Sequence, residues 1–244
     1  MSQSGRNTQS TEVLCLKQKA EISIQKAKEL ILKSIPNNEI VSIYLKGSYV
    51  QDEMLPDSDV DIVVILKSEE CLPLVYQLTE RYGDTVNPPF QIVAYTMKEL
   101  ETGEKASNRI KSTTSVSRFN KHLDSLPLIY GTRPEGRLFM RTDEKDLAIN
   151  IQNFRIMYIP DYKEGKFEFK QVVKQVFWLV EAEQRLKGLE PRYSWQKLAD
   201  STNDSKHIIH LALKYRKQDE ISKEEESDFM KRLEEYLNKI EDRG

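Results

Sequence analysis

"YLKGSYVQDEMLPDSDVDIVVIL", Tyr44–Leu66, is the stretch that decides how the rest of the chain is interpreted. It places two carboxylates, Asp59 and Asp61, one residue apart at the start of an apolar run. Alternate side chains of a strand share a face, so these two point the same way, where they repel each other and resist desolvation. A bound divalent cation removes that cost, and hard oxygen ligands at this spacing suit Mg²⁺.

The loop before this pair has the residues of a phosphate-binding turn. Gly47 follows a predicted strand and lets the backbone approach a ligand closely. Ser48 can cap a helix or donate its hydroxyl and N–H to a phosphate oxygen. The ten residues from Tyr49 to Ser58 hold a short helix and a turn, in which Pro56 fixes the backbone and Ser58 lies next to the aspartates.

The remaining segments predict an α+β fold with a mixed sheet flanked by helices, followed by an all-α part. Strands are expected at residues 39–47, 59–66, 90–96 and 126–131. Helices are expected around 20–31, 69–83, 173–186, 206–217 and 224–241. We expect a disordered lead at 1–12, a first domain at 13–135 and a helical domain at 136–244. Residues 108–122 are basic and hydroxyl-rich, and form either a helix or a mobile loop.

The composition of the chain argues against several classes of protein. The 244 residues carry a net charge of −2 with a pI of about 6.1, which disfavours binding to a long nucleic acid. Cys15 and Cys71 lack the spacing of a zinc site or a disulfide framework. No stretch approaches the ~20 apolar residues of a membrane span, and the first residues do not form a secretory signal. We therefore expect a cytoplasmic protein without membrane partners.

The combination of strand, Gly-Ser, ten residues, Asp-x-Asp and buried strand resembles the motif of the DNA polymerase beta-like nucleotidyltransferase superfamily. The resemblance implies that Asp59 and Asp61 are Mg²⁺ ligands. It implies that Gly47 and Ser48 contact the triphosphate of a nucleotide, and we expect Ser58 to contact the nucleotide as well. Members transfer a nucleoside monophosphate from an NTP to a hydroxyl or another acceptor and release pyrophosphate.

The helical half is similar in layout to the C-terminal domain of aminoglycoside adenylyltransferases. That similarity implies that Arg192 reaches the triphosphate and that Tyr215 lies near the nucleotide, unless Tyr215 is only a surface aromatic of its helix. It also implies an active site in the cleft between two domains, where ligands usually bind.

Two positions depart from the superfamily pattern. The third carboxylate expected on the next strand is replaced by Gln91, which can coordinate a metal through its carbonyl oxygen but cannot act as a base. Relatives often have Arg-Gly at the position of Gln51-Asp52, so a positive charge is missing near the phosphates. Lys46 either compensates for that charge or is a solvated strand end.

Several other polar residues have open assignments. Either another group replaces the missing base, or the acceptor needs little help, or the domain binds the nucleotide without turnover. The candidate bases are four glutamates, Glu99, Glu101, Glu181 and Glu183. The segment 108–122 contains four basic residues, Arg109, Lys111, Arg118 and Lys121. They either bind an anion, namely the triphosphate or an anionic acceptor, or form a solvated helix face. His207 and His210, three residues apart on a predicted helix, are expected to be structural rather than metal ligands.

The leading hypothesis is therefore a nucleotidyltransferase that moves an NMP, most simply AMP, from ATP or another NTP to a hydroxyl of a small molecule. One or two Mg²⁺ ions would serve as cofactor. The alternatives are transfer to a protein or an RNA acceptor, and an NTP-binding module with reduced catalysis, which Gln91 favours.

Overall fold

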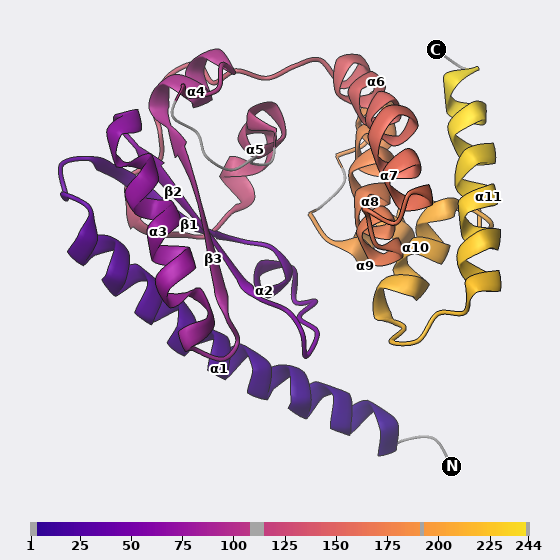
Figure 1. The fold of residues 1–244 in the computed structure, drawn as a ribbon, viewed down its shortest axis with the longest axis horizontal. Coiled ribbons are helices and arrows are strands. Elements are labelled where there is room, and N and C mark those ends of the chain that lie inside the picture. The colour runs from indigo at the N-terminus through magenta and orange to yellow at the C-terminus, as the bar shows by residue number, and fades with distance from the viewer. Residues whose placement is uncertain (1–3, 108–114, 191–192, 243–244) are drawn as a thin grey trace. The chain divides into compact units, whose positions relative to one another are not determined.

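The chain divides into two compact units, Met1–Met140 and Arg141–Gly244, in a computed structural model that describes residues 4–107, 115–190 and 193–242 (Figure 1). The boundary lies a few residues after the expected position at 135/136. Hydrogen bonds tie this segment to the first unit: the N–H of Phe139 donates to the Leu100 carbonyl at 2.8 Å, and Asn120 Nδ2 donates to the Phe139 carbonyl at 2.9 Å.

The first unit is a four-stranded sheet with helices, as the sequence predicts. Its elements are α1 (Ser4–Ser34), β1 (Ile40–Lys46), α2 (Ser48–Gln51), β2 (Val60–Leu66), η1 (Glu69–Cys71), α3 (Leu72–Tyr82), η2 (Gly83–Thr85), β3 (Phe90–Thr96), α4 (Met97–Thr102), α5 (Val116–His122), η3 (Leu123–Ser125) and β4 (Leu128–Gly131). The strand order is β3-β2-β1-β4. β1 pairs antiparallel with β2 and β4, whereas β2 and β3 are parallel, so the sheet is mixed.

The two faces of the sheet have different roles. Alternate residues of β2 and β3, including Val60, Ile62 and Ile92, join the main core of this unit with Ala27 and Ile31 of α1. α1 contacts α3, β2 and β3. The other face is covered at its far end, where Tyr95 of β3 stacks on Phe119 of α5 with ring centroids 4.7 Å apart. Asp61 belongs to this second face, since its neighbours Val60 and Ile62 are fully buried on the first.

The N-terminal segment differs from the prediction. α1 begins at Ser4, inside the stretch expected to be a disordered lead, and continues as one helix to Ser34 before Pro36 (Figure 1). The apolar spacing that predicts this helix starts only at Ala20, because the residues before it are mostly polar and give no helical periodicity.

The second unit is all-α. It contains α6 (Asp143–Asn153), the π-helical η4 (Phe154–Tyr158), α7 (Ile159–Lys163), α8 (Phe169–Leu186), α9 (Trp195–Asp200), α10 (Ile208–Lys217) and α11 (Lys223–Glu241). α8 is central, because it contacts α6, α7, α9 and α10. The predicted apolar face of α8, including Val173, Val176 and Phe177, is buried. Within the described ranges, no helix is long and apolar enough to cross a lipid bilayer.

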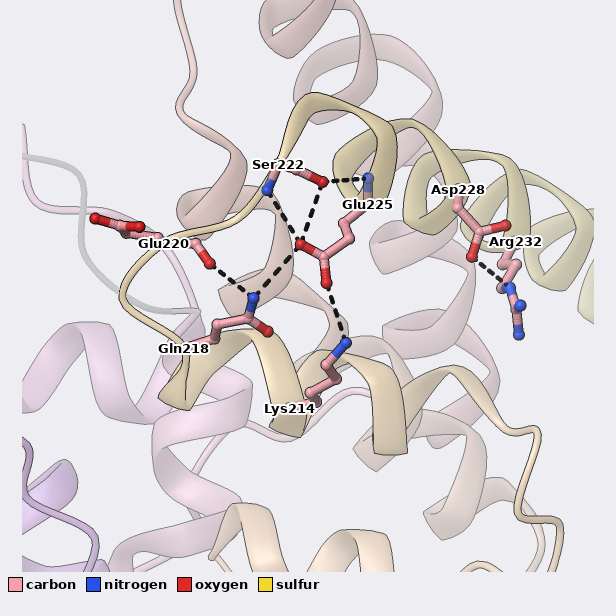
Figure 2. Close-up of polar contacts among 7 residues, drawn as sticks. All are labelled: Lys214, Gln218, Glu220, Ser222, Glu225, Asp228 and Arg232. Atoms are coloured by element: carbon pink, nitrogen blue, oxygen red, sulfur yellow. Dashed lines mark hydrogen bonds and ion pairs between the residues drawn. The ribbon is translucent and has the colours of Figure 1, made fainter.

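The turn between α10 and α11 is held by a polar network (Figure 2). Ser222 and Glu225 form a capping box at the start of α11, in which the Glu225 N–H donates to Ser222 Oγ and the Ser222 N–H donates to the Glu225 carboxylate. Lys214 of α10 donates to the same carboxylate at 3.2 Å. Gln218 links the turn by donating to the Glu220 carbonyl at 2.7 Å. Satisfying these helix-end groups fixes where α11 begins.

Candidate functional site

Three neighbouring strands bring three of the predicted site residues into one row. Asp61 of β2 is the register partner of Lys46 on β1 and of Gln91 on β3. Register partners on adjacent strands share a face, so the three side chains lie together on the face opposite α1 and α3. This placement explains why a buried strand can begin with a carboxylate, because Asp61 lies on the face that α1 and α3 do not cover.

The Asp61 carboxylate has a cation beside it. Lys46 Nζ lies 3.7 Å from Asp61 Oδ1, and the two side chains keep 18% and 26% of their exposure. A partly exposed pair of this kind contributes at most about 1 kcal/mol to stability, so its main effect is to orient the carboxylate. The structure thus places Lys46 against a candidate metal ligand, which is a more specific position than a solvated strand end.

Gly47 is required by the close approach of Asp61. Its backbone has φ 74° and ψ −159°, a conformation that only glycine adopts without strain. A Cβ built at this position would overlap the Asp61 carboxylate and lie 3.0 Å from its Cγ. The absence of a side chain at Gly47 therefore leaves the space in which the carboxylate sits.

The predicted short helix follows directly. α2 consists of only four residues, Ser48–Gln51, with Gly47 at its N-cap and no side-chain capping bond. Ser48 is therefore inside the helix and does not cap it, which leaves the second predicted role, donation to a ligand. The helix ends at Asp52, a non-glycine residue in the left-handed conformation with φ 60°.

Lys17 of α1 supports this segment and is a residue that the sequence analysis missed. Its ammonium forms an ion pair with Asp52 and lies 5.5 Å from the ring centroid of Tyr49. The contact connects residues 35 positions apart, so no local pattern predicts it. Asp52 is the position where relatives often have glycine, and Lys17 gives its carboxylate a partner.

The predicted turn before the aspartates is confirmed. The N–H of Ser58 donates to the Leu55 carbonyl at 2.9 Å, and the Leu55 N–H donates to Ser58 Oγ at 2.8 Å. Ser58 therefore closes the turn that contains Pro56, and this delivers the chain to Asp59 immediately before β2. The half-buried Asp59 lies outside the strand proper.

The donors at this edge fit a hard divalent cation. Asp59 and Asp61 supply carboxylate oxygens, and the exposed Gln91 supplies an amide oxygen on the face shared with Asp61. The Asp61 carboxylate occupies the space beside the backbone of Gly47. Over the residues that the structure describes, no group of three or more His, Cys, Asp or Glu side chains could hold a metal ion. The candidate site therefore offers two acidic donors and one neutral donor.

Two of the four glutamates considered as replacement bases lie at the wrong end of β3. Glu99 is 1% exposed and completes the capping box of α4, where it accepts from the Thr96 and Ala106 N–H groups at 2.9 Å. Glu101 is exposed on the same helix. Gln91 lies near the start of β3, roughly 17 Å along the strand from its end. Neither glutamate reaches the row that contains Asp61.

The other two glutamates belong to α8 of the helical unit. Glu181 is buried and pairs with Arg185 at 3.2 Å. Glu183 is buried beneath Tyr236, whose hydroxyl donates to it at 2.5 Å, and Lys187, whose Nζ lies 2.8 Å away. Burial raises the pKa of Glu183, but polar contacts with His207, Lys187 and Tyr236 outweigh burial and lower its pKa to about 2. A base with so low a pKa is weak at neutral pH.

Of the other residues predicted in the helical unit, two stabilise its fold and one lies outside the described residues. Tyr215 is 3% exposed, and its ring packs against Phe169 and Phe229 in the core, so it is not a surface aromatic. His207 caps α10 by accepting the Ile209 N–H at Nδ1. Arg192 lies outside the described residues, and its assignment to the triphosphate stays a prediction.

The basic segment is only partly described. Arg109 and Lys111 lie outside the described residues. Arg118 and Lys121 belong to α5, which confirms the helical alternative for that part of the segment, and both are half-buried. Their predicted contact with an anionic group stays a prediction.

Comparison with known protein families identifies the family of most of the sheet unit. Residues 25–114 match the family model of the nucleotidyltransferase domain. This part of the chain is a nucleotidyltransferase domain. The nucleotidyltransferase domain includes Gly47, Ser48, both aspartates and Gln91, and the matched residues end before β4. The comparison with curated proteins gave no match.

The match confirms the resemblance to the DNA polymerase beta-like superfamily and the α+β fold of the first unit. A nucleotidyltransferase domain uses an NTP and transfers its nucleotidyl group, which is the general chemistry expected from the motif. The helical unit lies outside the matched residues, so its similarity to aminoglycoside adenylyltransferases stays a prediction.

Proposed function

We propose that this protein is an Mg²⁺-dependent nucleotidyltransferase that moves an NMP, AMP in the simplest case, from an NTP to a hydroxyl of a small molecule and releases pyrophosphate. The observation that supports it most is the row of Lys46, Asp61 and Gln91, in which the Asp61 carboxylate lies against the backbone of Gly47. The net charge of −2 disfavours a long RNA acceptor.

Each residue at the sheet edge has a defined task in this proposal. Asp59 and Asp61 hold the metal, and Gln91 offers its amide oxygen to the same site. Gly47 and Ser48 present backbone N–H groups and a hydroxyl to the triphosphate. Bound Mg²⁺ would neutralise the charge on the phosphates and aspartates. Lys46 orients Asp61, and catalysis consists mainly of positioning and electrostatic stabilisation.

Gln91 supports a second candidate, an NTP-binding module with little or no turnover. A glutamine cannot take the proton of the acceptor hydroxyl, and neither Glu99 nor Glu101 replaces it geometrically. In this case the domain would bind MgNTP through the same aspartates without releasing pyrophosphate.

The cysteines support a proposed location in the cytoplasm. Both Cys15 and Cys71 are free thiols, and burial raises the pKa of Cys71, which makes it an unreactive core thiol. Free thiols fit a reducing compartment, and we assign the protein to the cytoplasm.

The metal assignment is tested with Asp59→Asn, Asp61→Asn and the matched control Asp57→Asn, which changes an exposed carboxylate in the same turn. We expect both site variants to lose Mn²⁺ binding, measured by water proton relaxation, and to lose metal-dependent NTP binding, measured by calorimetry. Asp57→Asn should behave like the wild type. Unchanged Mn²⁺ binding in Asp61→Asn would remove the metal site from this edge of the sheet.

A further inference from the structure

A cavity of about 310 Å³ lies wholly within the helical unit, among the ends of α8 and α11 and the loop from α9 to α10. Its size is at the lower end of the range for small-molecule sites. Its lining includes Glu183, Gln184, Lys187, Asp204 and Lys239. It is therefore polar on several sides, and the proposed nucleotidyl transfer assigns it no role.

Gln184 is the feature that points to a ligand. The residue is 3% exposed and lines the cavity. Within the part of the chain that the structure describes, its amide makes no side-chain hydrogen bond, and only its backbone carbonyl accepts, from Lys187 and Leu189. Buried amides are normally satisfied, so an unpartnered one beside a polar cavity is a group that a bound molecule can satisfy.

The lining offers two ammonium groups, those of Lys187 and Lys239, to an anion. Glu183 already has Lys187 at 2.8 Å and the Tyr236 hydroxyl at 2.5 Å, so its charge is compensated within the protein. Lys187 uses one of its three N–H groups on Glu183 and keeps about half of its exposure. Lys239 is exposed, and its ammonium has no partner among the described residues.

The remaining carboxylate limits the charge of that anion. Asp204 lines the same cavity, and its Oδ1 accepts the Lys206 N–H at 2.9 Å, which does not neutralise its charge. A highly charged group such as pyrophosphate would be repelled by it, whereas a molecule with a single anionic group could place that group on the lysines.

We propose that this cavity binds a small polar molecule carrying one carboxylate or phosphate monoester group. The anionic group lies between Lys187 and Lys239, and a hydroxyl or amine of the molecule pairs with the Gln184 amide. The site lies in the helical unit and is independent of the aspartates of the nucleotidyltransferase domain.

The test uses the full chain without nucleotide and with a chelator, so that the metal-dependent site is silent. Glycerol 3-phosphate and glycerate are the two probes, which distinguish a phosphate ester from a carboxylate, and glycerol is the uncharged control. We expect one charged probe to raise the unfolding midpoint and to bind by calorimetry. Its Kd should rise about tenfold or more in Lys239→Ala and in Gln184→Met.

Two controls locate the binding. Lys174→Ala removes an exposed lysine from α8 outside the cavity and should leave the Kd unchanged, as should Asp61→Asn. Gln184→Met should fold as well as the wild type without a probe, because its amide has no protein partner to lose. No binding of either charged probe, equal Kd values in the cavity variants, or a marked loss of unliganded stability in Gln184→Met would each overturn the proposal.

Discussion

At the scale of single residues, the surroundings of Asp61 determine how its carboxylate can act. Its carboxylate faces Lys46 on one strand and Gln91 on the other, and it occupies the space that Gly47 leaves by having no side chain. A carboxylate held in this way is oriented before any ligand arrives. The neighbouring Gln91 then sets how much acid–base chemistry the site can perform.

Gln91→Glu tests this directly. The change adds a third carboxylate to the row, which strengthens metal binding and supplies a group able to take a proton from the acceptor. We expect the rate of transfer to rise, by up to about 100-fold if proton removal limits it. The measurement is kcat with the identified acceptor, over a range of Mg²⁺ concentrations.

The matched control for Gln91→Glu is Gln77→Glu, which adds the same charge at an exposed position of α3. It should leave kcat unchanged. An unchanged rate in Gln91→Glu would place the base elsewhere, whereas a loss of tenfold or more would show that the amide itself has a positive role and contradict the expectation.

At the scale of elements, α2 depends on α1 for its position. Lys17 reaches from α1 to Tyr49, within the four-residue helix after Gly47, and to Asp52 at the end of that helix. We expect Lys17→Ala to raise the KM for the NTP by a few-fold with little change in kcat, since it loosens the loop that positions the triphosphate. Lys17→Arg should restore most of the loss.

Lys19→Ala is the control for this prediction, because it removes an exposed lysine two positions away on the same helix. It should have the KM of the wild type. Equal effects of Lys17→Ala and Lys19→Ala would mean that only the general charge of α1 matters and would contradict the role of the Asp52 contact.

The elements that the sequence predicts are those with strong local patterns. The β-branched runs predict β1, β2 and β3 nearly to the residue, and Gly47 and Pro56 mark the loop and turn between the first two strands. Positions that depend on distant partners are not predictable in this way. Glu99 is a candidate base from its position just beyond β3, and only its contacts with Thr96 and Ala106 show that it caps α4.

At the scale of the whole molecule, the two units have separate hydrophobic cores, and tryptophan fluorescence detects the unfolding of only one of them. Its only two tryptophans, Trp178 and Trp195, both belong to the helical unit. Tryptophan fluorescence therefore follows the unfolding of that unit alone. The burial of Tyr215 in this core was not expected from the sequence, because a lone aromatic between polar residues can face inward or outward.

Glu183 makes the stability of the helical unit depend on pH. Its folded pKa, about 2, is below the ordinary value of 4.5, so its contribution is fully present above about pH 5 and is lost as the pH falls toward 2. We expect Glu183→Gln to lower the free energy of unfolding at pH 7. The difference from the wild type should shrink as the pH falls from 5 to about 2.

Urea unfolding followed by tryptophan fluorescence measures this difference at each pH. Comparing the two proteins at the same pH cancels the titration of all other carboxylates. A difference that stays constant between pH 5 and about 2 would show that the charge of Glu183 does not stabilise the fold.

The central claim is nucleotidyl transfer at the edge of the sheet, and pyrophosphate release tests it most directly. MgATP and the other NTPs are incubated with a panel of aminoglycosides and related alcohols, using wild type, Asp61→Asn and Asp57→Asn. We predict release that requires one class of acceptor, disappears in Asp61→Asn and persists in Asp57→Asn. Release that survives in Asp61→Asn would contradict the proposed site, and metal-dependent NTP binding without release for any acceptor would contradict small-molecule transfer.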